Sequence, residues 1–298
     1  MLQNYSITTV LTASASTDLT DLATIKDELS ITAADTANDA WLARAQKQSS
    51  KAIANFCNRT FAVQLYKDNI RRRLDWWYAG YLPNDRTPLS LGCAPVVAVI
   101  SIIEDGVTLA AATDFEVDLD RGFLYRLDAT SGDPTNWTSE QVIVVYLSGY
   151  GSQAVQAATV PANPGPYTIT VANAATFSVD VGVAYASAVP LVVVASAPAH
   201  GQYSVAAGVY SFNAADAGGS VTITYGQTKI PDDVVDAALR LVTMRFKQKG
   251  RDPMLMSQSQ PNLGDKRWWV GTAPGQNGAL PPEIKGLLEG AYRVPVIG

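Results

Sequence analysis

Residues 141–151 read QVIVVYLSGYG, a run of β-branched and aromatic residues that ends in a glycine-rich turn. From residue 152 to residue 227 the chain then holds no lysine or arginine and only two acidic residues, Asp180 and Asp216. All 22 basic residues of the 298-residue chain therefore lie outside this stretch. Such a break in composition indicates a separate module, and we predict an inserted domain over residues 152–227.

The pattern within residues 152–227 is typical of short strands. Runs rich in valine, isoleucine, threonine and tyrosine alternate with turn signals such as NPG at residues 163–165 and AGG at residues 217–219. The expected strands are residues 167–171, 177–183, 191–194, 202–205, 208–212 and 220–225. The inserted domain is therefore predicted to be all-β, in a sandwich or barrel-like arrangement.

Helices are predicted on both sides of this insert. Asp21 is placed to cap a helix that starts at Leu22, and an apolar stripe predicts a longer helix over residues 36–58. After the insert, Pro231 stands where helices often begin, and residues 232–246 again place apolar side chains at helical spacing. The ends of the chain are therefore expected to be helical.

The segment between the first helices and the insert is expected to form a small β-sheet, with a hairpin turn at residues 104–106. The predicted fold class is therefore α+β: a helical host domain with a small β-sheet, split by the inserted all-β domain. The host domain would comprise residues 1–151 and 228–250. Residues 251–298 hold 6 of the 16 prolines and are predicted to form an extended C-terminal arm with a short terminal helix.

The composition argues against several classes of function. A net charge of −5 disfavours a nucleic-acid binder that works through a broadly basic surface. Two cysteines, Cys57 and Cys93, and one histidine, His200, disfavour a disulfide scaffold, a Cys/His zinc site and a hydrolase with several histidines. We expect no enzymatic activity, no metal and no cofactor, and no apolar run has the length of a membrane helix.

Alternating acidic residues from Asp114 to Asp120 have the appearance of a calcium loop. An EF-hand needs glycine at its sixth position and glutamate at its twelfth, where this chain has Leu119 and Tyr125. Apolar residues alternate with the acids, so a half-exposed strand is the better interpretation. His200 is interpreted as a solvated turn residue.

One basic run and one aromatic pair have a functional interpretation. Arg71 and Arg73 share a face if residues 71–73 lie on a strand, which indicates either a solvated edge or a contact to a neighbouring subunit or to phosphate in a ring or channel. Trp268 and Trp269 lie in the proline- and glycine-rich arm, and tryptophan is enriched at binding hot spots. The pair therefore favours an interface anchor.

Several strings occur in an order that resembles a known family. They are LATIKDELSI at residues 22–31, FCNRTF at 56–61, PVVAV at 95–99, EDGV at 104–107, RGFLY at 121–125, VVYLSGYG at 144–151, IPDDV at 230–234, LPPEI at 280–284 and YR at 292–293. This ordered set resembles the head–tail connector adaptors of long-tailed double-stranded DNA phages, the head-completion proteins that ring the portal. Residues 152–227 depart from that pattern, and they resemble a small β module of phage structural proteins.

The resemblance implies a structural protein that forms a homo-oligomeric ring, twelve-fold in the expected case, beneath the portal protein. The ring would extend the DNA channel and offer a platform for the next tail-completion or tail-terminator protein. Genomic DNA would pass without specific binding, which suits an acidic chain because phosphate contacts would obstruct its passage. The expected location is the neck of the virion, after assembly in the host cytoplasm.

The arm is expected to dock this protein to the portal, because it carries more apolar side chains than a free segment would expose. The residues proposed for this contact are Trp268, Trp269, Ile284, Leu287, Leu288 and Tyr292. The alternative is that the arm folds back over its own domain or over the adjacent subunit.

Two other functions remain open at this point. The first is a β-rich virion decoration or host-surface-binding protein whose insert recognises a surface or a glycan. The second is a hydrolase, for which Asp118 and Asp120 are the best remaining candidates. A ring many times heavier than one chain would distinguish the adaptor from both.

Overall fold

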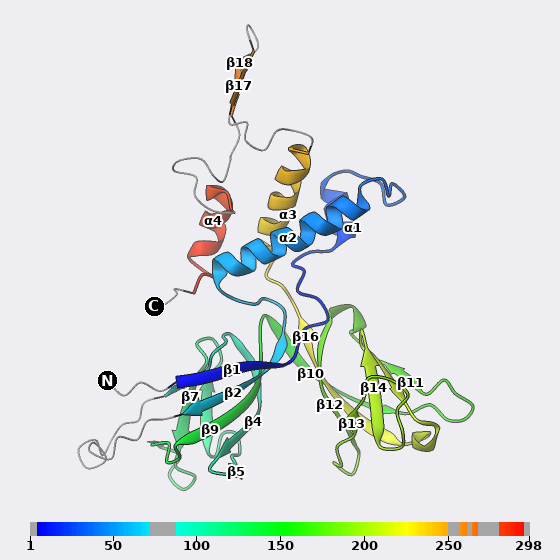
Figure 1. The fold of residues 1–298 in the computed structure, drawn as a ribbon. Coiled ribbons are helices and arrows are strands. Elements are labelled where there is room, and N and C mark those ends of the chain that lie inside the picture. Colours follow the sequence, from blue (N-terminus) through cyan, green and yellow to red (C-terminus); the bar gives the residue numbers. More distant parts are fainter. Residues whose placement is uncertain (1–4, 72–87, 250–256, 261–263, 268–279, 295–298) are drawn as a thin grey trace, which may run out of the picture. The chain divides into compact units, whose positions relative to one another are not determined.

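The computed structural model forms two compact units (Figure 1). The strand-rich unit comprises residues 1–16 and 62–229, and the helical unit comprises residues 17–61 and 230–298. The residues that the structure describes are 5–71, 88–249, 257–260, 264–267 and 280–294.

The first half of the strand-rich unit is built on a five-stranded antiparallel sheet with the order β1-β2-β9-β4-β5. Its strands are β1 (Tyr5–Thr12), β2 (Gln64–Arg71), β9 (Gln141–Ser148), β4 (Val96–Glu104) and β5 (Val107–Thr108). Strand β9 is the central one, and Val142, Val144 and Tyr146 point to one face and are completely buried. The run QVIVVYLS therefore forms the middle of the sheet.

A second, four-stranded sheet completes this half of the unit. Its strands are β3 (Leu89–Ser90), β7 (Phe123–Leu127), β6 (Phe115–Asp118) and β8 (Pro134–Thr135), with β7 paired to the other three. Leu89, Leu124 and Phe115 join the buried residues of β9 in one hydrophobic core. The expected hairpin is confirmed: β4 and β5 pair across the turn, where Gly106 has a φ of +79° that favours glycine.

The second half of the strand-rich unit is the all-β module. A three-stranded sheet has the order β10-β16-β12, and a four-stranded sheet has the order β11-β15-β14-β13. The strands are β10 (Gly151–Thr159), β11 (Thr168–Thr170), β12 (Phe177–Tyr185), β13 (Val192–Val193), β14 (Gln202–Ala206), β15 (Val209–Phe212) and β16 (Ser220–Thr228). Both sheets contribute to one core, which includes Ile169, Tyr203, Tyr210 and Ile223. All six expected strands are confirmed, and β10 is an additional one.

The module also packs against the five-stranded sheet. Val179 lies in a small apolar cluster with Val63, Leu65 and Leu147. The close approach needs Gly226, because a Cβ atom there would lie 2.7 Å from Val179 Cγ1 and 2.9 Å from Val63 Cγ1. The two halves of the unit thus share an apolar contact as well as having cores of their own.

The helical unit contains α1 (Leu22–Glu28), α2 (Asp39–Cys57), α3 (Asp232–Lys247), α4 (Pro282–Glu289) and a hairpin of β17 (Ser257–Gln260) and β18 (Gly264–Arg267). Asp21 caps α1 as expected, because its Oδ1 accepts a hydrogen bond from Thr24 N at 2.8 Å. Ile25, Leu42, Ala45 and Val242 form a buried cluster between three of the helices.

The predicted fold class is wrong in its description of the host. Residues 5–148 alone contribute a five-stranded and a four-stranded sheet, and strands outweigh helices over the residues that the structure describes. The host is therefore not a helical domain with a small sheet. The prediction failed for a physical reason. Residues 62–151 have enough apolar positions to form a separate core between two sheets, but several of the strands are too short to be recognised from the sequence pattern.

Candidate functional site

The terminal helix α4 packs inside the helical unit. Ile284 and Leu288 are buried, whereas Leu287 keeps 36% of its surface exposed. Tyr292 Oη donates a hydrogen bond to Asp233 Oδ1 at 2.8 Å, and its ring meets that of Phe61 edge-on at 5.8 Å. Of these side chains, Leu287 is therefore the one most available to a partner.

Two of the proposed docking residues, Trp268 and Trp269, lie outside the described residues, as does Arg73. Arg71 is described, and it is exposed at the end of β2, opposite Gln141 of β9. Of the residues proposed for portal docking, the structure describes the three on α4 and Tyr292, which follows that helix. The portal-binding and channel roles stay predictions.

A groove of about 650 Å³ runs beside α3 and α4 within the helical unit, and it combines apolar and charged lining. Met244 and Ile284 supply apolar surface, and Asp236 and Arg240 form an ion pair of 2.9 Å along one wall. The hydrogen bond that Arg240 donates to Asp236 raises the pKa of the guanidinium above its ordinary value. Helix α4, which lines this groove through Ile284, also carries the exposed Leu287.

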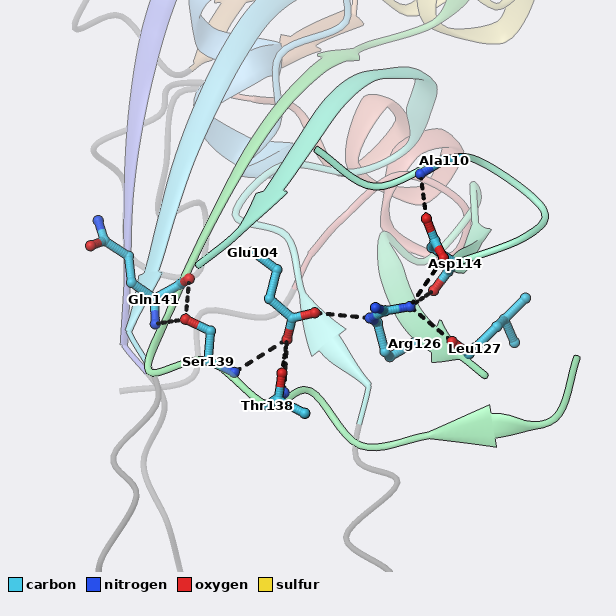
Figure 2. Close-up of polar contacts among 8 residues, drawn as sticks. All are labelled: Glu104, Ala110, Asp114, Arg126, Leu127, Thr138, Ser139 and Gln141. Carbon is cyan, nitrogen blue, oxygen red and sulfur yellow. Dashed lines mark hydrogen bonds and ion pairs between the residues drawn. The ribbon is translucent and has the colours of Figure 1, made fainter. Parts of the chain in front are cut away.

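A buried polar network closes one end of the sheets in the strand-rich unit (Figure 2). Arg126 on β7 donates from Nε to Glu104 Oε2 at 2.9 Å and from Nη1 to the carbonyl of Asp114 at 2.7 Å. Glu104, at the end of β4, also accepts hydrogen bonds through Oε1 from the backbone N–H groups of Thr138 and Ser139. The network therefore ties together β4, β7 and the loops that lead to β6 and β9.

The protonation of Glu104 follows from these contacts. Burial by itself would raise the pKa of this carboxyl, but the hydrogen bonds from Arg126, Thr138 and Ser139 outweigh burial and hold the pKa below its ordinary value. Glu104 is therefore an ionised acceptor at neutral pH. An ionised glutamate with its acceptor sites occupied is suited to holding loops in place and poorly suited to general acid catalysis.

The two acidic residues of the module are also internal. Asp180 accepts hydrogen bonds from Tyr203 Oη at 2.6 Å and Tyr210 Oη at 2.8 Å, and burial raises the pKa of its carboxyl. Asp216 is buried, and its Oδ1 accepts from Tyr185 Oη at 2.5 Å and lies 2.6 Å from Nδ1 of His200. Burial, followed by the hydrogen bond to Asp216, raises the pKa of Tyr185 to about 12. Both carboxylates thus hold the module together through tyrosines.

Sequence reasoning missed these buried contacts. The partners of Glu104 lie 22, 34 and 35 residues away along the chain, so no local motif reveals the network. His200 is exposed in a turn, as interpreted, but its pairing with Asp216 was not foreseen. The one available signal was that Asp180 and Asp216 are the only acids in an otherwise uncharged stretch, which indicates internal roles.

Asp118, the hydrolase candidate, accepts a hydrogen bond from Arg121 N at 3.1 Å through Oδ1 and so shapes the turn between β6 and β7. Among the described residues, no cluster of three or more histidine, cysteine or acidic side chains has the arrangement of a metal site. Within that same part of the chain, no helix combines the length and the apolar character needed to cross a membrane.

No protein-family model matches this chain, and no curated protein matches it. Two solved structures show weak similarity. One is a chain in the neck of an empty gene transfer agent particle, with 17% identity, a TM-score of 0.29, and coverage of 51% of this chain and 73% of that one. The other is a chain in the virion of a native gene transfer agent particle, with 16% identity, a TM-score of 0.30, and coverage of 49% and 73%. Similarity at this level establishes neither a shared fold nor a shared function.

Proposed function

We propose that this protein is a head–tail connector adaptor: a non-catalytic subunit of a ring beneath the portal of a phage-like particle. The ring would extend the DNA channel without binding DNA specifically and would receive the next tail-completion or tail-terminator protein. Its place would be the neck of the virion, after assembly in the host cytoplasm. A twelve-fold ring is the expected stoichiometry.

One observation carries the proposal: strings that resemble the adaptor family, and that come from opposite ends of the chain, meet in the helical unit. Tyr292 contacts Phe61 through its ring and Asp233 through its hydroxyl. The Arg293 guanidinium lies 5.0 Å from the centre of the Phe56 ring. The segments at residues 56–61 and 292–293, more than 200 residues apart in the sequence, thus pack against each other. This contact supports the proposal, because the segments that carry the resemblance form one folded unit.

We assign the portal contact to only part of the proposed set of residues. Because Ile284 and Leu288 are buried, they would support α4, whereas Leu287, Trp268 and Trp269 would enter the portal surface. Arg71, with Arg73, would face a neighbouring subunit or the channel.

The test is co-sedimentation of the purified chain with the portal protein of the same particle. Replacing Leu287, Trp268 and Trp269 by alanine should weaken portal binding at least about tenfold, because aromatic anchors dominate interface energies. The control is Val189→Ala, which truncates an apolar side chain of the module that is more exposed than Leu287. Equal binding by the triple variant and wild type would overturn the assignment.

A second candidate function is a β-rich virion decoration or host-surface-binding protein. It is favoured by three apolar side chains of the module, Val189, Val192 and Val193, each of which is more than half exposed. Sedimentation distinguishes the two functions. A decoration protein would sediment as a monomer or trimer and ignore the portal, whereas the adaptor would form a large ring that binds it.

A further inference from the structure

Strands β1 and β10 lie at sheet edges in the strand-rich unit, so each has one side without a partner strand. Strand β1 pairs with β2 through seven residue pairs, and β10 pairs with β16 through nine. Among the described residues, no further strand pairs with either one. Each therefore presents a row of backbone N–H and C=O groups that can accept another strand.

Neither strand has the usual protection against such pairing. The sequences YSITTVLT of β1 and GSQAVQAAT of β10 contain no charged residue and no proline. Strand β10 pairs with β16 in unbroken register, and β1 has a single irregularity near its end, between Val10 and Thr12. Both are longer than the average strand. Long, uncharged and regular edges are the kind that associate with other chains.

The other edges in this unit are protected. Strand β12 and strand β4, which β5 covers over only two residues, each contain two register shifts, which bend an edge away from a partner. Strand β6 carries Glu116 and Asp118, and the remaining edge strands are two or three residues long. Protection is thus missing at two edges only among the described strands of the unit.

We propose that β1 of one copy adds as a strand to β10 of the next copy. The side chains differ in size: β1 exposes Ile7, Val10 and Leu11, whereas β10 has mostly small side chains such as Ala154 and Ala157, with Val155 as its one exposed branched apolar residue. Pairing β1 with another β1 would set bulky side chains against each other, and pairing β10 with β10 would bury little apolar area.

A contact between two different edges is head-to-tail, so each copy has two neighbours and the series can close into a ring. This inference rests on the ring that forms part of the proposed function. It goes further by assigning the subunit contact to two strands. It also gives the inserted module a role, because β10 opens that module and would carry half of every junction.

The test uses one variant for each edge. The β1 variant carries Ile7→Lys and Val10→Lys, and the β10 variant carries Val155→Lys and Ala157→Lys, all at exposed positions. The control carries Val107→Lys and Val209→Lys, at exposed positions away from both edges. Circular dichroism verifies that each variant is folded, and sedimentation velocity measures its size.

Wild type and control should form the ring, and each edge variant alone should remain a monomer. A mixture of the two edge variants should form dimers, because one junction then has both strands unchanged. Dimers of the β10 variant alone would mean that β1 pairs with itself, and rings of either variant would mean that the edges are not the contact. Either result overturns the inference, as does a wild-type chain that stays monomeric.

Hydrogen exchange gives an independent measurement on the wild-type chain. Amides of β1 and β10 should exchange at least about tenfold more slowly in the ring than in dissociated subunits. Unchanged exchange in these strands would contradict the inference. Wild-type rings that do not bind the portal would refute the adaptor function but not the pairing of β1 with β10. Portal-binding rings formed by the edge variants would refute the pairing but not the adaptor function.

Discussion

Replacing Arg126 by methionine tests whether the buried network holds the strand-rich unit together. The substitution keeps most of the side-chain volume but removes the partner of Glu104, which is 5% exposed, and the donor to the Asp114 carbonyl. Removing one member of a buried ion pair typically costs 3–5 kcal/mol, because the other charge stays buried without compensation. Arg126 keeps 19% of its side chain exposed, so we expect a loss of about 3 kcal/mol in the free energy of unfolding.

Chemical denaturation followed by circular dichroism measures this loss. The control is Arg240→Met, which breaks the exposed pair with Asp236 and should change stability little. The double variant Glu104→Gln with Arg126→Met should lose less than the sum of the two single variants, because the uncompensated charge is gone. Equal stability of Arg126→Met and the control would refute the reasoning.

The same network predicts a dependence on pH. The folded-state pKa of Glu104 lies below its unfolded value, so the network contributes stability that is fully present above the unfolded pKa of about 4.3. This contribution is lost as the pH falls through the folded pKa. The stability difference between wild type and Glu104→Gln should therefore be largest near neutral pH and shrink below about pH 4. A difference that stays constant down to pH 3 would contradict the ionised state of Glu104.

Three further predictions concern the module and one cysteine. Gly151 and Thr228 face each other across β10 and β16, so they can be joined directly to delete the module. The shortened chain should fold, should be less stable by about 3 kcal/mol because Val63 and Leu147 become uncovered, and should no longer form rings. Loss of all secondary structure would show that the module is part of the host core. Asp216→Ala should lower the melting temperature of the chain more than His200→Ala does, because the carboxylate is the shared buried acceptor and the imidazole is mostly exposed; the reverse order would contradict this role. Burial raises the pKa of Cys57 to about 11, so iodoacetamide at pH 8 should modify this thiol at least about a hundredfold more slowly in the native than in the unfolded chain. Mass spectrometry measures both rates, and equal rates would be inconsistent with the burial of Cys57.

The helices were the best predicted part of the structure. The helices α2 and α3 are long and have apolar stripes, and an N-cap residue marks the start of α1 in the sequence, so each signal spans many residues or has a specific chemistry. The strands of the module were also predicted, because turn residues separate them. Periodicity cannot show how many short strands join into sheets, and for this reason the host was wrongly described as helical with a small sheet.

Strand β10 was missed because it consists mainly of alanine, glutamine and serine, which have little preference for strands. Its pairing with β16 over nine residues stabilises the extended conformation that its composition does not favour. The network of Glu104 and Arg126 was missed for a related reason: its members meet only after the two sheets have packed. Tertiary contacts determine both features, and a single sequence does not display them.

The adaptor proposal is tested most directly by electron microscopy of the purified chain mixed with the portal protein of the same particle. We expect a single additional ring, twelve-fold in the expected case, stacked coaxially on the tail-facing end of the portal, with an open central channel. Portal particles without that ring, at concentrations well above those at which the chain assembles, would contradict the adaptor function.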